Sequence, residues 1–178
     1  MPTAVETRIA LERADRLVTI APERGYRTYV NTARIVEGTQ CEIEEKGHRI
    51  LVDAGKGLGG GDKDPTASML LRGALSSCIA IGIKMWAARR EIRVDQVLVT
   101  VETDTDARGI LGLNDKVPPG FTATRVRIEV QSPAPPAEVE AIVAASLRFS
   151  PLIDALANPQ FIETDFAVIS PEECFDGR

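Results

Sequence analysis

Residues 65–90 read PTASMLLRGALSSCIAIGIKMWAARR, a run that is apolar on nearly every face of a helix. The run predicts one helix over 65–90, roughly 39 Å long at 1.5 Å per residue. A helix with so little polar surface must be covered on most sides by other elements. Gly73 and Gly82 each disfavour a helix interior by about 1 kcal/mol, and such a cost is offset where another backbone or a ligand comes close. We therefore expect this helix at the centre of the fold.

Shorter elements are predicted on both sides of this helix. Upstream, helical spacing predicts a helix over 4–20, and alternating runs predict three antiparallel strands over 29–36, 40–44 and 49–52. Downstream, the patterns predict strands 97–101 and 124–130, helices 137–149 and 151–157, and a last strand 161–169. The chain is thus expected to form a single domain over 1–178. Its parts are a helical extension (1–24), strands with a glycine-rich loop (25–64), the central helix (65–90), and strands with two helices (93–170).

Composition excludes several classes of function. The chain has 178 residues, is 44% hydrophobic and carries a formal net charge of -5. Nucleic acid is not an expected partner, because a negative protein has no general attraction for phosphates and only 4% of the residues are aromatic. The 3 cysteines and 1 histidine are scattered, so we expect neither a disulfide framework nor a metal site. No cofactor is expected either.

The sequence also predicts a cytoplasmic protein that does not associate with a membrane. No unbroken apolar segment typical of a secretion signal lies near the N-terminus. Arg72 and Lys84 interrupt the central apolar run, and each would cost about 2.5–3.5 kcal/mol near a bilayer centre. A buried helix of a soluble protein is therefore the better interpretation of this run, and the sparse cysteines indicate a reducing compartment.

Several short motifs accompany the predicted order of elements. Asp53 precedes the loop that ends in GGGDKDP (59–65), the central helix contains LLRGALSSC (70–78) and AARR (87–90), and SPL (150–152) opens the later short helix. In these motifs and their order, over residues 31–168, the chain resembles the OsmC/Ohr family of organic hydroperoxide reductases.

This resemblance implies an OsmC-like α+β fold, with antiparallel strands around a long buried central helix, assembled as an intertwined homodimer. It implies a peroxidase of the oxidative-stress response in which the Cys78 thiol attacks the O–O bond of a small organic hydroperoxide at the dimer interface. The central helix favours the same assembly, because it needs more cover than one small set of strands offers.

The chain departs from the family pattern at this site. Ser150 stands where the family has a second cysteine that condenses with the oxidised first one, and Ser68 and Met69 stand where the family has a glutamate. An arginine completes the family site, and Arg49 and Arg72 are the nearest candidates. The resemblance therefore implies a reaction in which Cys78 is the only peroxidatic cysteine. Its oxidised form is reduced by an external thiol or, as the alternative, by Cys174.

Each of these residues also has a structural interpretation. Cys78 lies deep in an apolar run, as a small core residue would, and Ser150 before a proline is typical of a helix N-cap. Cys41 is expected to face inward from a strand, Cys174 lies in the tail, and His48 is expected in a turn. Two other functions remain open: a non-catalytic member of the family that binds a small apolar molecule in the interface pocket, and a purely structural dimer.

Overall fold

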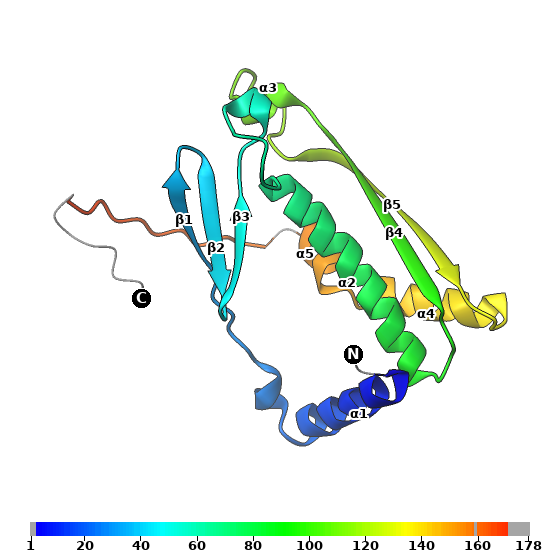
Figure 1. The fold of residues 1–178 in the computed structure, drawn as a ribbon. Coiled ribbons are helices and arrows are strands. Elements are labelled where there is room, and N and C mark those ends of the chain that lie inside the picture. Colours follow the sequence, from blue (N-terminus) through cyan, green and yellow to red (C-terminus); the bar gives the residue numbers. More distant parts are fainter. Residues whose placement is uncertain (1–2, 159, 171–178) are drawn as a thin grey trace.

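The computed structural model describes residues 3–158 and 160–170 (Figure 1). The first half contains α1 (Ala4–Ile20), the 3-10 helix η1 (Pro22–Gly25), β1 (Thr32–Glu37), β2 (Gln40–Glu45), β3 (His48–Val52) and the 3-10 helix η2 (Lys56–Leu58). The second half contains α2 (Ala67–Arg89), β4 (Gln96–Thr105), α3 (Ala107–Ile110), β5 (Phe121–Gln131), α4 (Pro136–Arg148) and α5 (Pro151–Ala157). The predicted α+β arrangement, with antiparallel strands around a long helix, is confirmed.

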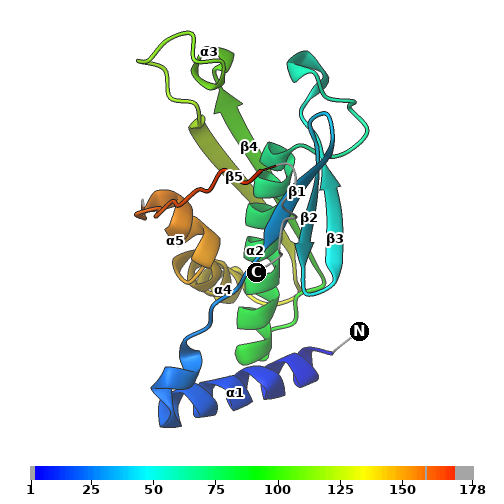
Figure 2. The same cartoon turned by 90° about the vertical axis from the view of Figure 1, so that its left-hand side faces the viewer.

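The core lies between α2, α4 and the antiparallel hairpin of β4 and β5. Ile79 and Ile83 of α2 and Ile142 of α4 are fully buried there, and side chains of the hairpin and α5 pack against them. Figures 1 and 2 show α2 between this hairpin and the three-stranded sheet, with α1 across the end of α2. The inward face of α2 is thus covered by elements that follow it in the sequence.

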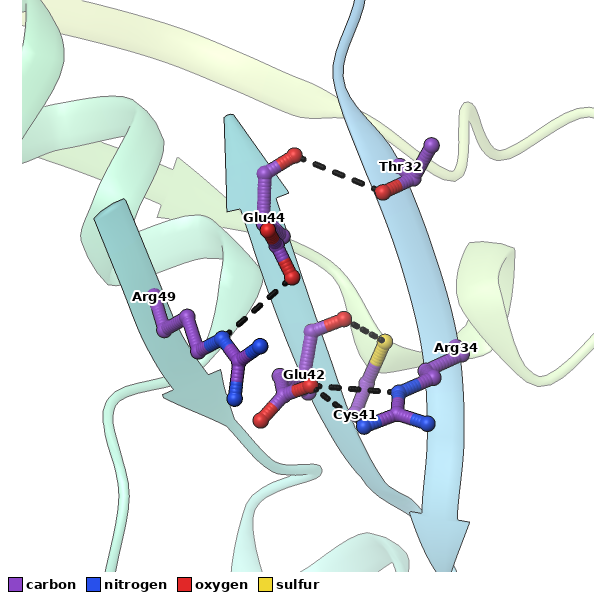
Figure 3. Close-up of polar contacts among 6 residues, drawn as sticks. All are labelled: Thr32, Arg34, Cys41, Glu42, Glu44 and Arg49. Carbon is purple, nitrogen blue, oxygen red and sulfur yellow. Dashed lines mark hydrogen bonds and ion pairs between the residues drawn. The ribbon is translucent and has the colours of Figure 1, made fainter. Parts of the chain in front are cut away.

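The strands β1, β2 and β3 form an antiparallel sheet with two different faces. Residues paired directly across strands share a face, and the register gathers six small or apolar residues on one face: Ala33, Ile35, Cys41, Ile43, Ile50 and Val52. The opposite face carries the ion pairs Arg34–Glu42 at 2.8 Å and Arg49–Glu44 at 3.3 Å (Figure 3). Only Val52 of the apolar face is buried, so most of this face is uncovered in the single chain.

The central helix begins later than the sequence indicates. The expected span is 65–90, whereas α2 begins at Ala67 and is capped by the Thr66 hydroxyl, which accepts from the backbone N–H of Met69 at 3.2 Å. Two contacts explain the difference. The Pro65 carbonyl accepts from the backbone N–H of Asp53, and the Asp64 carboxylate accepts from Gln40 at 2.7 Å, so both residues are held to the sheet.

Part of α2 is exposed, contrary to the expectation of a helix covered on nearly all sides. Ile81 is 59% exposed and Met69 52% exposed. Among the described residues, α2 is the one helix long and apolar enough to cross a membrane by length and composition, a test that core helices of soluble proteins also pass. The described residues therefore leave part of the central helix uncovered.

Two further expectations need correction. The last strand, expected over 161–169, is not formed in the described segment 160–170, where Phe161 and Phe166 are almost fully exposed. A strand requires a neighbouring strand for its hydrogen bonds, and none is paired with this segment. In the polar stretch after β4, the Asp106 carboxylate caps the short helix α3, so the described part of 93–170 holds three helices rather than two.

The close contact between α2 and α4 depends on Gly82. A Cβ atom added to Gly82 would collide with the Oγ of Ser146, whose hydroxyl donates to the carbonyl of Ile79 at 3.0 Å. The sequence-based expectation that another element approaches this glycine is therefore confirmed. At Gly73 no atom lies within 4 Å of such a Cβ, so the described chain brings nothing close there.

We expect Gly82→Ala to destabilise the protein, because the added methyl group must displace Ser146. Overpacking of this kind lowers the free energy of unfolding by about 1–3 kcal/mol. Alanine in place of glycine raises helix propensity by about 1 kcal/mol, so the net effect is destabilising. Chemical denaturation measures the effect. The double variant Gly82→Ala with Ser146→Ala should be more stable than Gly82→Ala alone. If the changes in the free energy of unfolding of the two single variants simply added up in the double variant, the expected contact between residues 82 and 146 would be wrong.

Candidate functional site

The structure brings Cys78 and Ser150 together although 72 residues separate them. The Cys78 Sγ and the Ser150 Oγ lie 3.4 Å apart, within hydrogen-bonding distance. Cys78 projects from the middle of α2, and Ser150 is the N-cap residue directly before α5. The contact between Gly82 and Ser146 fixes α4 against α2 and so places the start of α5 beside Cys78.

Ser150 has two structural roles at once. Its Oγ accepts from the backbone N–H of Ile153 at 3.3 Å, and Pro151 follows it at the first helical position, so the predicted N-cap is confirmed. Ser150 is only 4% exposed. Because a hydroxyl has two lone pairs and one proton, the proton remains available while the Oγ accepts from Ile153. Ser150 can therefore donate to the sulfur of Cys78.

An aromatic pair lies next to this contact. Phe149, the residue before Ser150, packs its ring 5.4 Å from that of Trp86 on α2, at an interplanar angle of 30°. Arg89 lies over the Trp86 ring at 5.4 Å. The ring contact between Trp86 and Phe149 holds the corner between α4 and α5 against α2. The sequence does not predict the contact between Trp86 and Phe149, because no recognisable motif contains these two residues.

The two candidate arginines lie elsewhere in the single chain. Arg49 is on the charged face of the three-stranded sheet, where its guanidinium pairs with Glu44 (Figure 3). Arg72 donates to the Thr103 hydroxyl of β4 at 3.3 Å. Among the described residues, neither guanidinium has a hydrogen bond to Cys78. A catalytic role for Arg49 therefore stays a prediction.

Among the described residues, neither Cys41 nor His48 forms a hydrogen bond with Cys78 or Ser150. Cys41 lies on the apolar face of the sheet, beside Val52 on the neighbouring strand, and its sulfur is 3.9 Å from the carbonyl of Glu42. His48 is the first residue of β3, directly after the turn in which it was expected. Cys174 lies outside the described residues. Within those residues, no group of three or more His, Cys, Asp or Glu side chains could hold a metal ion.

Hydrogen bonds to Asp53 hold the loop between β3 and α2 in place. The Asp53 carboxylate accepts from the Thr39 hydroxyl at 2.6 Å, from the backbone N–H of Gly61 at 2.6 Å and from that of Ala54 at 2.7 Å. The hydrogen bond from Thr39 and the two backbone N–H groups hold the pKa of Asp53 below its usual value. Asp53 therefore stays ionised at neutral pH and holds the glycine-rich loop at the start of α2.

Residues 59–165, which include Cys78 and Ser150, match the model of the OsmC-like protein family. The chain belongs to this family. No curated protein is significantly similar to it in sequence. The predicted family resemblance is confirmed, and this OsmC-like protein can be compared with solved structures of the same fold.

Three such structures are similar to this OsmC-like protein. An OsmC-like protein from Mycoplasma pneumoniae has 16% identity and a TM-score of 0.64, with 75% of this chain and 89% of the other covered. An organic hydroperoxide resistance protein from Elizabethkingia anophelis has 19% identity and a TM-score of 0.55 (75% and 91% covered). The organic hydroperoxide resistance protein OhrB of Bacillus subtilis has 18% identity and a TM-score of 0.51 (75% and 93% covered). At these identities the likeness establishes the fold.

Proposed function

We propose that this OsmC-like protein reduces organic hydroperoxides with Cys78 as its only reactive thiol. The observation that carries the proposal is the 3.4 Å contact between Cys78 and Ser150, at the family position of the second cysteine. When the sulfur is a thiolate it has no proton to give, so the Ser150 hydroxyl must be the donor. Ser150 would then orient the nucleophile without being oxidised itself.

The reaction can be written with all atoms accounted for. The Cys78 thiolate attacks one oxygen of ROOH, the O–O bond breaks, and the alkoxide leaves and takes a proton to become the alcohol. The sulfur, now oxidised by two electrons, is a sulfenic acid. A serine hydroxyl cannot form a disulfide, so an external thiol attacks the sulfur and releases water, and a second thiol displaces Cys78 as a free thiol. Two external thiols supply the two electrons.

The proposal includes a homodimer in a reducing, cytoplasmic environment. Among the described residues, three surfaces expose apolar side chains: one face of the three-stranded sheet, the face of α2 that bears Ile81, and the segment 160–170 with Phe161 and Phe166. Exposed apolar surface of this extent is typical of an interaction site. A second copy of the chain would cover all three, and it could add Arg49 to the environment of Cys78.

Mass spectrometry of peroxide-treated protein tests the proposal. Cumene hydroperoxide should oxidise Cys78 to a sulfenic acid that dimedone traps, and a small thiol should restore the free thiol. A variant with both Cys41→Ser and Cys174→Ser should react at the same rate, whereas Cys78→Ser should consume no hydroperoxide. If Cys78 remained reduced in folded protein under excess hydroperoxide, the peroxidase function would be wrong.

The second candidate is a non-catalytic protein that binds a small apolar molecule at the same place. Two observations favour it. Among the described residues no arginine has a hydrogen bond to Cys78, and N-capping of α5 by itself accounts for the presence of Ser150. It predicts that Cys78 is inert while an apolar molecule is retained in native mass spectrometry. The dimedone experiment therefore decides between the two functions.

A further inference from the structure

Three contacts between α2 and the corner of α4 and α5 follow one face of α2. Cys78, Gly82 and Trp86 are each four residues apart, a spacing that places side chains one above another on a helix. Their partners from the corner are, in the same order, Ser150, Ser146 and Phe149. The corner therefore lies along about two turns of α2, with Cys78 at one end and Trp86 at the other.

The backbone alone holds this corner weakly. Phe149 is the C-cap of α4 and Ser150 the N-cap of α5, so the chain passes from one helix to the next within these two residues. The backbone nitrogen of Ser150 lies 3.4 Å from the carbonyl oxygen of Leu147, which is long for a hydrogen bond. The helix α5 has 7 residues, fewer than the roughly 12–15 that an isolated helix needs for stability in water. Side-chain contacts must therefore determine where the Ser150 hydroxyl lies.

Side chains hold Ser150 from both directions along the chain. After it, Leu152 and Ile153 of α5 pack against the buried core. Before it, the ring of Phe149 lies 5.4 Å from that of Trp86, a separation typical of a favourable aromatic pair, and Trp86 itself packs against the core. Trp86 is thus a fixed platform, and Phe149 attaches the α4 side of the corner to it.

Phe149 contributes little to the core itself. Its side chain is 59% exposed, and it is not one of the described side chains that pack against the buried core. The guanidinium of Arg148 lies over its ring at 5.1 Å. Replacement of Phe149 should therefore leave the fold intact, and the residue most directly affected is the next one in the chain, Ser150.

We propose that Phe149 is a positioning residue of the Cys78 site. Its ring, held against Trp86, keeps the Ser150 hydroxyl within hydrogen-bonding distance of the Cys78 sulfur. The proposal rests on the peroxidase function proposed above, in which this hydroxyl orients the Cys78 thiolate. Phe149 acts through Ser150 alone: without the ring contact the corner moves on α2, and the hydroxyl spends less time beside the sulfur.

A disulfide between positions 78 and 150 measures this placement without any hydroperoxide. In Ser150→Cys, with Cys41→Ser and Cys174→Ser also present, oxidised glutathione converts the two thiols to a disulfide and is itself reduced to two molecules of thiol. The equilibrium constant gives the effective concentration of one thiol at the other. Adding Phe149→Ala should lower this constant about two- to tenfold, the range that the loss of an aromatic pair allows. Phe149→Tyr, which keeps the ring, should preserve it.

Leu98→Ala is the matched control for the glutathione experiment. Leu98 is 59% exposed, as Phe149 is, and lies on β4 opposite Glu129 of β5, outside the corner. This variant also removes an exposed apolar side chain, but it should leave the equilibrium constant unchanged. Equal constants with and without Phe149→Ala, or an equal loss in Leu98→Ala, would overturn the proposal.

The rate of thiol oxidation shows whether the ring acts through Ser150. Phe149→Ala should slow the oxidation of Cys78 by cumene hydroperoxide about two- to tenfold when Ser150 is present. In Ser150→Ala the same change should have no further effect, because the hydroxyl that the ring positions is gone. Mass spectrometry of the thiol at several hydroperoxide concentrations gives the rate constants, and circular dichroism confirms that each variant is folded.

A purely structural role of Phe149 would give a different result, because a change in stability alone does not alter the rate constant of folded protein. Equal slowing in the presence and absence of the Ser150 hydroxyl would overturn the proposal. If Cys78 were inert toward hydroperoxide in the unaltered protein, the peroxidase function would be wrong and Phe149 would have no part in such a reaction. The glutathione constants would still decide whether the ring contact positions residue 150.

Discussion

Replacement of Ser150 by cysteine is expected to change the product of hydroperoxide treatment from a sulfenic acid to an intramolecular disulfide. The two side-chain atoms already lie 3.4 Å apart, and a disulfide needs about 2.05 Å between its sulfurs, so a small adjustment of the two side chains brings them within bonding distance. In Ser150→Cys, one equivalent of hydroperoxide should remove two free thiols and leave nothing for dimedone to trap. In the unaltered protein, one thiol should be lost and dimedone should label Cys78.

Ser146→Cys is the matched control for this experiment. Ser146 lies four residues before Ser150, near the end of α4, and is about as buried, but its hydroxyl donates to the carbonyl of Ile79 rather than to Cys78. A cysteine there should not form a disulfide with Cys78. If Ser150→Cys remained reactive to dimedone after oxidation, or if Ser146→Cys formed the disulfide instead, the proposed geometry of the oxidised site would be wrong.

The second large effect is expected in the three-stranded sheet. Ile50→Lys places a charge on the apolar face, opposite Ile43, and we expect it to halve the molecular mass in solution by separating two copies of the chain. The physical reason is that an unpaired ammonium inside an apolar interface must be desolvated. Analytical ultracentrifugation with light scattering measures the mass, and circular dichroism reports whether the separated chain keeps its helices.

Leu51→Lys is the control for this variant, one residue along the same strand. Leu51 lies on the opposite face, directly across from Glu42, where a lysine gains an acidic neighbour. This variant should keep the mass of the unaltered protein. A monomeric unaltered protein, or equal dissociation in both variants, would contradict the proposed role of the apolar face.

The parts of the fold that follow from local patterns could be predicted from the sequence. The apolar run around Cys78 and the serine-proline pair at 150–151 each determine a helix or its start within a few residues, because periodicity and capping act over one or two turns. The meeting of Cys78 with Ser150 is a long-range contact, and only the family resemblance suggested it.

Other features depend on neighbours that no local pattern identifies. The ion pair between Asp15 and Arg89, which fixes α1, joins residues 74 positions apart. The hydrogen bonds to the Asp53 carboxylate join it to Thr39 and Gly61, which lie in two other segments of the chain. The segment 161–169 has the alternation of a strand, but an alternating pattern cannot provide the neighbouring strand. For the same reason the sequence could not place Arg49 relative to Cys78.

The oxygen of Ser150 has a kinetic consequence for the proposed reaction. A second cysteine at this position would be present at a fixed, high effective concentration, and the oxidised sulfur would be resolved at a rate independent of the surroundings. With a hydroxyl there, resolution becomes a second-order step whose rate rises and falls with the concentration of thiol in solution. One atom, oxygen in place of sulfur, would thus make the turnover of this protein follow the thiol supply around it.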